Sequence, residues 1–137
     1  MLQLIVDNKL VEINRICFSD GAVSYDLKDF PLSANKVVIG VDPSFKVSGL
    51  LNELNQLLHT VYRVSDNIDL QIEMNLPYFP YSRADRRFSD NGNEGLKYFI
   101  NELECNGIFK LYAVDPHNLK ALEDYCDNAG IRLDYLD

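Results

Sequence analysis

Three arginines lie within five residues of an otherwise acidic chain. Arg83, Arg86 and Arg87 are half of the six arginines in a sequence of 137 residues with a net charge of -8. An arginine side chain carries a planar, permanently charged fork of donors that matches the oxygens of a phosphate. Like charges this close repel one another, so the cluster predicts either a bound anion or neutralisation by the nearby Asp85 and Asp90. Composition alone leaves both interpretations open: a phosphate site or a surface salt-bridge cluster.

The segment before the cluster favours a binding loop. "PYFPY", residues 77–81, combines two prolines with three aromatic residues. Such a stretch restricts the backbone, and a preorganised loop loses less conformational entropy when it binds a ligand. This segment therefore shifts the balance toward an anion site.

Two further stretches contain side chains that could take part in binding. In "VDPHN", residues 114–118, a histidine after a proline is most often a helix-start residue. The functional alternative is that Asp115 and His117 contact a magnesium-bound nucleotide, directly or through water. Magnesium prefers oxygen ligands and keeps several waters, so His117 would be an unusual direct ligand. "FSDG", residues 18–21, is a simple turn when taken by itself.

Bulk composition narrows the class of protein. A chain of this length fits one domain, and its pI of about 4.6 argues against a general nucleic-acid or membrane surface. No apolar run approaches the ~18 residues that a membrane-spanning helix needs, and the N-terminus lacks the features of a signal peptide. Three cysteines without a close pair, Cys17, Cys105 and Cys126, suggest neither a disulfide framework nor a zinc site. We expect a cytoplasmic protein with reduced thiols.

The amino-terminal part of the chain is predicted to be β-structure. Alternation of apolar and polar residues predicts strands at "LQLIV" and "LVEINRICF", joined by a turn at Asp7-Asn8-Lys9. A further strand is predicted at residues 22–27. "KVVIGV", residues 36–41, is apolar on both faces, which is typical of a buried parallel strand.

After residue 44 the apolar period changes to three and four residues, which predicts a helix between Ser44 and Ser65. The remaining predicted elements alternate: a strand at 68–74, a helix at 94–106, a strand at 109–114, a helix at 117–129 and a strand at 131–136. This order predicts an α/β fold, a parallel doubly wound sheet in a single domain with an N-terminal β-hairpin. Chemistry in such folds lies in loops that leave the carboxyl ends of the strands, where both loops singled out above are placed.

Three segments, in this order and spacing, resemble ribose-phosphate pyrophosphokinase, that is, phosphoribosyl pyrophosphate (PRPP) synthetase. They are "FSDGA" (18–22), "PYFPYSRADR" (77–86) and "DPH" (115–117). The family shows F-S-D-G-E, P-Y-x-x-Y-A-R-Q-D-R and D-L-H or D-P-H at these places. The resemblance spans essentially the whole chain but only the amino-terminal half of the family's length. The short loops and the D-P-H variant are most similar to versions carried by bacteriophages.

The resemblance implies phosphoribosyltransferase-like α/β domains and a role in nucleotide biosynthesis. Family members transfer the β,γ-diphosphate of ATP to the 1-hydroxyl of ribose 5-phosphate, with magnesium as the cofactor. Carried over to this sequence, Arg83 and Arg86 lie along the ATP site, and Asp85 supports the loop. His117, together with Asp115, contacts the magnesium-ATP polyphosphate. Reactions of this kind depend on positioning and charge neutralisation more than on covalent catalysis.

The resemblance also implies that Phe18 and Asp20 reach the adenine bound to a neighbouring subunit, so a homo-oligomer is expected. Two positions depart from the family. Ala22 stands where the family has glutamate, and Ala84 stands where it has glutamine. Losing two hydrogen-bonding groups in a desolvated site costs up to a few kcal/mol. These departures put ATP specificity in question.

The family's D-D-x-x-x-T-G-G-T loop, which binds ribose 5-phosphate, has no counterpart in this sequence, so we expect the carboxy-terminal domain to be absent and the chain to be inactive alone. Three interpretations follow. The chain is the ATP-binding half of a synthetase completed by a partner half; or an inactive relative that binds nucleotide or regulates a complete synthetase; or a domain that kept the fold for another interaction.

Overall fold

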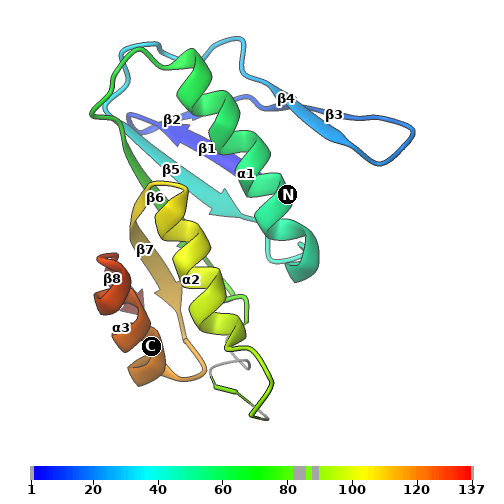
Figure 1. The fold of residues 1–137 in the computed structure, drawn as a ribbon. Helices are drawn as coiled ribbons and strands as arrows, with labels where there is room; N and C mark the ends of the chain where they lie inside the picture. Colours follow the sequence, from blue (N-terminus) through cyan, green and yellow to red (C-terminus); the bar gives the residue numbers. More distant parts are fainter. Residues whose placement is uncertain (1, 82–85, 88–89, 137) are drawn as a thin grey trace. The chain divides into compact units, whose positions relative to one another are not determined.

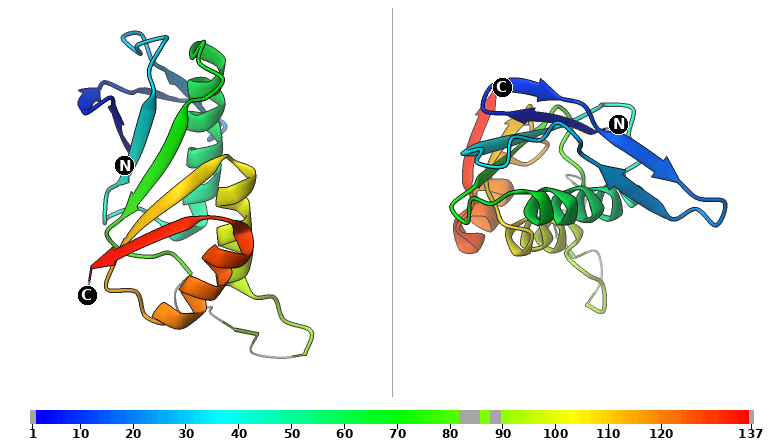
Figure 2. Two further views of the ribbon diagram at one scale, coloured as in Figure 1. Left: turned by 90° about the vertical axis from the view of Figure 1, so that its left-hand side faces the viewer. Right: turned by 90° about the horizontal axis from the view of Figure 1, so that it is seen from above.

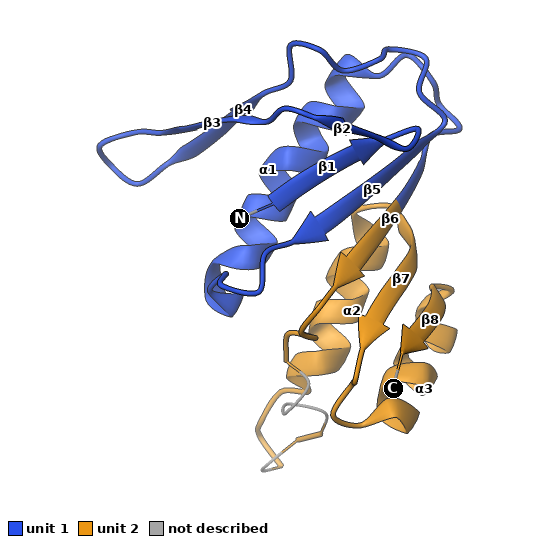
Figure 3. Ribbon diagram, turned by 180° about the vertical axis from the view of Figure 1, so that it is seen from behind, with its two compact units in different colours: residues 1–72 blue, residues 73–137 orange. Residues whose placement is uncertain are grey.

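The computed structural model describes residues 2–81, 86–87 and 90–136 of the chain. Over these residues, the fold is of the mixed α/β class, with a mostly parallel sheet, three helices and an N-terminal hairpin, as the sequence predicts (Figure 1). Two compact units make up the chain, Met1–Ile72 and Glu73–Asp137, coloured separately in Figure 3. Within the described residues, no helix is both long and apolar enough to span a bilayer.

Unit 1 begins with an antiparallel hairpin. Strands β1 (Leu2–Val6) and β2 (Lys9–Val11) pair with each other, and β1 also pairs antiparallel with β5 (Lys36–Val41). The predicted turn is confirmed: Asp7 and Asn8 both have positive φ, 47° and 68°, as a tight two-residue hairpin turn requires. The Asp7 carboxylate also accepts a hydrogen bond from the backbone N–H of Lys36 at 3.0 Å, which ties the turn to the start of β5.

A second hairpin stands apart from this sheet. Strands β3 (Asn14–Cys17) and β4 (Val23–Asp26) pair only with each other among the described strands (Figure 2). The prediction of one strand over "LVEINRICF" is therefore wrong. The chain changes its pairing partner between Val11 and Asn14, because β2 pairs with β1 whereas β3 pairs with β4. The backbone N–H of Phe18 donates to the carbonyl of Ala22 at 2.8 Å and closes the hairpin tip.

Helix α1 (Val47–Val64) packs along the sheet of unit 1 and against β4. The predicted helix is confirmed, and its apolar positions are buried, namely Leu50, Leu54, Leu57, Leu58 and Val61. Inward-facing strand residues such as Leu4 and Ile39 are fully buried as well. Full burial of a Leu or Ile side chain contributes about 1.5–3 kcal/mol, so this layer is the core of the unit. The residues of β5 that alternate with the buried ones, such as Val38, are only half-buried. The prediction that β5 is buried on both faces is therefore wrong.

Unit 2 is built from strand–helix–strand repeats. Strand β6 (Gln71–Leu76) begins with the last two residues of unit 1 and continues into unit 2. The strands β6, β7 (Ile108–Val114) and β8 (Arg132–Leu136) are neighbours in that order, and β7 pairs parallel with β8. The helices α2 (Gly95–Cys105) and α3 (Leu119–Ala129) pack on one another, so they share one face of these strands. Each helix is followed by a glycine with positive φ, Gly107 at 85° and Gly130 at 73°.

The strand predicted at residues 68–74 lies later in the chain, at 71–76. Ile68, predicted to begin it, is 97% exposed. The cause is a turn organised by Asn67, whose side-chain oxygen accepts from the N–H of Asp69 at 2.9 Å and whose carbonyl accepts from the N–H of Leu70 at 3.3 Å. This turn delays the extended backbone until Gln71, and it moves the carboxyl end of β6 to Leu76.

Candidate functional site

The loop that follows β6 is anchored to α2 by aromatic packing. The ring of Phe79 is buried and meets Phe99 edge to face, with ring centroids 5.9 Å apart. The ring of Tyr81 lies 5.4 Å from the same Phe99, and Tyr81 has a positive φ of 61°. A non-glycine residue in this backbone region costs energy and is held there by its surroundings. The expectation that the aromatic stretch stiffens the approach to the arginines agrees with this packing.

The arginine cluster itself is only partly described. The predicted site residues Arg83 and Asp85 lie outside the described residues. Arg86 is exposed. Arg87 Nη1 donates a 3.4 Å hydrogen bond to the backbone carbonyl of Asp90, and Arg87 Nε lies 3.8 Å from a carboxylate oxygen of Glu94. The salt-bridge interpretation of the cluster therefore applies to Arg87, and its acidic partner is Glu94.

The loop that follows β7 holds the second group of predicted residues. Asp115 has a positive φ of 43°, and its N–H donates to the carbonyl of Leu136 at 2.7 Å, which fixes the end of β7 against β8. His117 is exposed. The helix begins at Leu119, two residues later than predicted, because the Asn118 side chain caps it by accepting from the N–H of Ala121 at 3.2 Å. His117 thus precedes the cap and belongs to the loop.

The two loops meet at one crevice. Phe79 from the β6 loop and Pro116 and His117 from the β7 loop line it together with residues of α2 and α3. The crevice has no room for a water-sized sphere, so any ligand at this edge would lie on the exposed surface above it. The side-by-side placement of the loops is what the strand order predicted for the carboxyl ends of β6 and β7.

No group of three or more potential metal ligands forms among the residues that the structure describes. Asp115 and His117 are two residues apart in the β7 loop and supply at most two ligands. Magnesium keeps several waters and takes oxygen ligands from bound phosphates, so a pair of protein contacts is enough for a metal that arrives with a nucleotide. The predicted roles of Asp115 and His117 stay predictions.

The third predicted segment lies at the tip of the β3–β4 hairpin in unit 1. The Phe18 side chain is 54% exposed. A carboxylate oxygen of Asp20 accepts from the N–H of Ala22 at 2.9 Å, so the turn interpretation of "FSDG" is confirmed. Exposed Phe18 and Asp20 side chains on a hairpin tip are accessible to another molecule, and their predicted contact with adenine stays a prediction.

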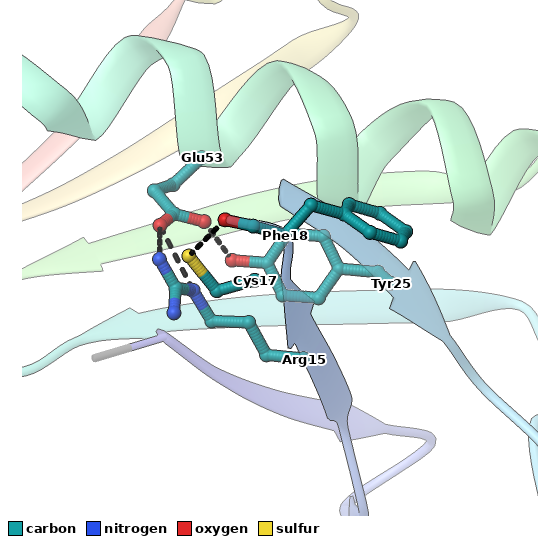
Figure 4. Close-up of polar contacts among 5 residues, drawn as sticks. All are labelled: Arg15, Cys17, Phe18, Tyr25 and Glu53. Atoms are coloured by element: carbon teal, nitrogen blue, oxygen red, sulfur yellow. Dashed lines mark hydrogen bonds and ion pairs between the residues drawn. The ribbon is translucent and has the colours of Figure 1, made fainter. Parts of the chain in front are cut away.

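A buried polar cluster where this hairpin meets α1 was not predicted from the sequence. It consists of Arg15, Tyr25 and Glu53, and we call it the Glu53 cluster (Figure 4). Among the described residues, Glu53 is the charged residue that is buried in the core, and only 5% of its surface is exposed. Arg15 donates to it from Nε at 2.9 Å and from Nη2 at 2.5 Å, and the Tyr25 hydroxyl donates to its other oxygen. A glutamate between Leu50 and Leu54 on the apolar face of a predicted helix was the signal that could have revealed it.

Electrostatics of the cluster follow from these contacts. Burial opposes ionisation of Glu53, but the hydrogen bonds from Arg15 and Tyr25 outweigh it and hold the pKa of Glu53 below its usual value. Burial first, and then the hydrogen bond to Glu53, raises the pKa of Tyr25. Glu53 is therefore a carboxylate and Tyr25 a neutral hydroxyl at neutral pH.

Separately, burial raises the pKa of the Cys126 thiol to about 12, so this free cysteine is unreactive.

Comparison with known proteins bears on the fold. No protein-family model matches the chain, and no curated protein sequence matches it. Among solved structures, the chain is similar to the crystal structure of phosphoribosylpyrophosphate synthetase from Mycobacterium smegmatis, with a TM-score of 0.73 and 16% sequence identity. The match covers 96% of this chain and 41% of that one. At this identity the likeness concerns the fold: nearly the whole chain folds like about two fifths of a PRPP synthetase.

Proposed function

We propose that this chain is an ATP-binding half of the PRPP synthetase type, which contributes contacts to magnesium-ATP for diphosphate transfer to ribose 5-phosphate. One observation carries the proposal. Two loops with phosphate-binding residue types line one crevice at the carboxyl ends of β6 and β7, in a chain that folds like part of a PRPP synthetase. Ligands of open α/β sheets bind at such strand ends.

The proposed roles follow from the chemistry of each group. The Arg83 and Arg86 guanidinium groups donate paired hydrogen bonds to phosphate oxygens, and Asp85 supports their loop. His117 and Asp115 contact the polyphosphate and its magnesium, directly or through bound water. Magnesium, when bound with ATP, neutralises phosphate charge. Because Arg87 is already paired with Glu94 and with the carbonyl of Asp90, it takes no part in this proposal.

Phe18 and Asp20 complete the proposed nucleotide site from a second copy of the chain. The aromatic ring offers a stacking surface for adenine, and the Asp20 carboxylate offers an acceptor for its amino group. Ile16 and Phe18 of the hairpin are both exposed and are therefore accessible to a second copy. This arrangement makes the proposed protein a homo-oligomer.

The ribose 5-phosphate site belongs to a partner in this proposal. The chain matches only 41% of the synthetase structure, so the remaining part of a composite active site is supplied by a carboxy-terminal half or by a complete synthetase. A second candidate function is an inactive regulatory subunit that binds to a synthetase without turnover of its own. Ala22 and Ala84 favour this second candidate, because each replaces a polar side chain of the family's ATP site.

Calorimetric titration of magnesium-ATP into the purified protein tests the proposal. We expect a dissociation constant between micromolar and millimolar, and at least a tenfold loss in the Arg83→Ala, Arg86→Ala double variant. A matched control is Arg63→Ala with Arg132→Ala, which removes the same charge from the last turn of α1 and from β8. Equal losses in the two double variants, or no heat from the wild-type protein at several millimolar ATP, would refute an ATP site in the arginine cluster.

The two candidate functions differ in their response to a partner. Addition of a chain that carries the ribose 5-phosphate loop should produce diphosphate transfer only if the first candidate is right. If the second is right, the chain should instead change the rate of a complete synthetase without adding turnover. Formation of phosphoribosyl pyrophosphate is measured in both mixtures, one with the added chain and one with a complete synthetase, and the results distinguish the two candidate functions.

A further inference from the structure

The β3–β4 hairpin is attached to the rest of unit 1 chiefly through β4, whose Tyr25 is buried near the base. Tyr25 on β4 is buried at 8% exposure, whereas all four residues of β3 are exposed. Towards the tip, Ile16 and Phe18 are exposed to solvent as well. A two-stranded ribbon in which only one strand is partly buried has little independent stability, so its orientation depends chiefly on the contacts near its base.

The Glu53 carboxylate supplies contacts to both strands of the hairpin. One oxygen accepts two hydrogen bonds from Arg15 on β3, and the other accepts from the Tyr25 hydroxyl on β4. Hydrogen bonds to an ionised carboxylate are stronger than those between neutral groups. A single side chain of α1 therefore joins the helix to both strands (Figure 4).

Beyond this cluster, the space between the hairpin and the start of α1 is open. A cavity of about 450 Å³ lies there, lined on one side by Arg15, Gly21 and Val23 of the hairpin. On the other side it is lined by the loop and first turns of α1, from Ser44 to Glu53. A Cβ added to Gly49 in this wall would meet no atom within 4 Å. The tip is thus not held against α1 by packing, which leaves the Glu53 cluster at its base to set its direction.

We propose that Glu53 is a positioning residue, which holds the β3–β4 hairpin on α1 and thereby sets the direction in which Phe18 and Asp20 are presented. The first half of this inference stands on unit 1 alone, and the second half rests on the proposed ATP-binding function. Glu53 lies at the base of the hairpin and contacts neither Phe18 nor Asp20 among the hydrogen bonds of the described residues, so it acts through Arg15 and Tyr25. Loss of the carboxylate leaves the fold of the sheet in place and frees the hairpin.

Amide hydrogen exchange tests the first half without any ligand. In Glu53→Gln, which keeps the side-chain shape and removes the charge, we expect exchange over residues 14–26 to accelerate about tenfold or more. Exchange in β5 and in the core of α1 should stay within about twofold of the wild-type rates. The matched control is Glu12→Gln, an exposed glutamate of the same unit, which should leave the hairpin rates unchanged. Unchanged hairpin exchange in Glu53→Gln, or equal acceleration throughout unit 1, would overturn the positioning role.

A second variant keeps the test informative if Glu53→Gln does not fold. Tyr25→Phe keeps the ring in the core and removes only the hydroxyl that donates to Glu53. We expect acceleration over residues 14–26 that is smaller than in Glu53→Gln, because the two hydrogen bonds from Arg15 survive. Hairpin rates equal to those of the wild-type protein would again argue against the role.

Magnesium-ATP titration of the same variants tests the second half. We expect Glu53→Gln to weaken ATP binding about tenfold, although every residue of the β6 and β7 loops is intact. If the wild-type protein binds ATP and Glu53→Gln binds it equally well despite a mobile hairpin, the hairpin direction does not matter for binding and the second half fails. If the wild-type protein binds no ATP, the proposed function fails together with this second half, while the exchange rates still decide the first half.

Discussion

The Glu53 cluster of unit 1 and the β6 loop of unit 2 both place arginines near a carboxylate, but they differ in burial. In the Glu53 cluster the carboxylate is buried, and it accepts hydrogen bonds from Arg15 and Tyr25. In the β6 loop Arg87 is exposed, and its Nε lies 3.8 Å from a carboxylate oxygen of Glu94. Burial of a charge is tolerated only when partners satisfy it, so the first arrangement is coupled to the fold, whereas the second can form or break at little cost.

This difference separates structural charge from charge that is available to a ligand. The Glu53 carboxylate already accepts three hydrogen bonds from its own chain, so we assign the Glu53 cluster to position and not to recognition. In the proposed function, exposed basic groups at the ends of parallel strands are the ones that meet an incoming anion. Substitution of Glu53 should therefore change stability directly and ligand affinity only through the hairpin.

The largest expected effect is at Phe99, which supports the β6 loop. Phe99 is fully buried, and both Phe79 and Tyr81 pack against it. Phe99→Ala should lower the free energy of unfolding by about 3–5 kcal/mol, because it removes a large side chain and leaves a cavity. Urea denaturation measures this, with Phe109→Ala as the matched control because Phe109 is 36% exposed. Equal losses in the two variants would show that the aromatic anchor does not stabilise the unit.

The next largest effect is at Glu53. Glu53→Ala removes the acceptor for three hydrogen bonds and leaves the hydroxyl of Tyr25 buried without this partner. We expect a loss of about 1–3 kcal/mol in the free energy of unfolding, the cost of leaving a buried donor without its partner. Arg15 is 39% exposed and can rehydrate, which keeps the loss below that for a fully buried ion pair. Glu12→Ala, measured in the same urea titration, should change stability by less than about 0.5 kcal/mol.

Acid should weaken the same cluster in a predictable direction. The pKa of Glu53 lies below its ordinary value of 4.5 in the folded chain, so ionised Glu53 favours the folded state. This contribution is fully present above pH 4.5 and is lost as the pH falls through the lowered folded-state pKa. The stability difference between the wild-type protein and Glu53→Gln should therefore shrink below about pH 4, as measured by urea denaturation at several pH values. A difference that stays constant down to pH 2 would mean that Glu53 does not titrate in this way.

Local sequence patterns predicted the elements well where neighbouring residues decide the structure. The strand at residues 36–41 has the predicted bounds, and the tight turn at Asp7-Asn8 follows from residue types that tolerate positive φ. The division of "LVEINRICF" between two sheets could not be predicted in this way. Both halves alternate as strands do, and the choice of pairing partner depends on residues far away in the chain.

In the candidate site, too, some features could be predicted from the sequence and others could not. Placement of the β6 and β7 loops side by side followed from strand order, and the shared crevice of Phe79 and His117 agrees with it. The partners of individual charges did not follow, because side-chain pairing is a tertiary property. Arg87 pairs with Glu94 at the start of α2, a partner that the sequence did not indicate.

The smallest expected effect on stability is at Arg87, the exposed arginine of the β6 loop. Its side chain is 55% exposed and its distance to Glu94 is long, so Arg87→Ala should change the free energy of unfolding by less than about 0.5 kcal/mol. Lys120→Ala, which breaks a more exposed pair with Asp124 on α3, is the control and should also have a small effect. Because Arg87 is engaged with its own chain, its removal should also leave magnesium-ATP affinity within about twofold, unlike the Arg83 and Arg86 double variant. A loss of affinity as large as that of the double variant would mean that Arg87 leaves Glu94 to bind ATP. Exposed ion pairs in this loop would then supply hydrogen-bond donors to the ligand.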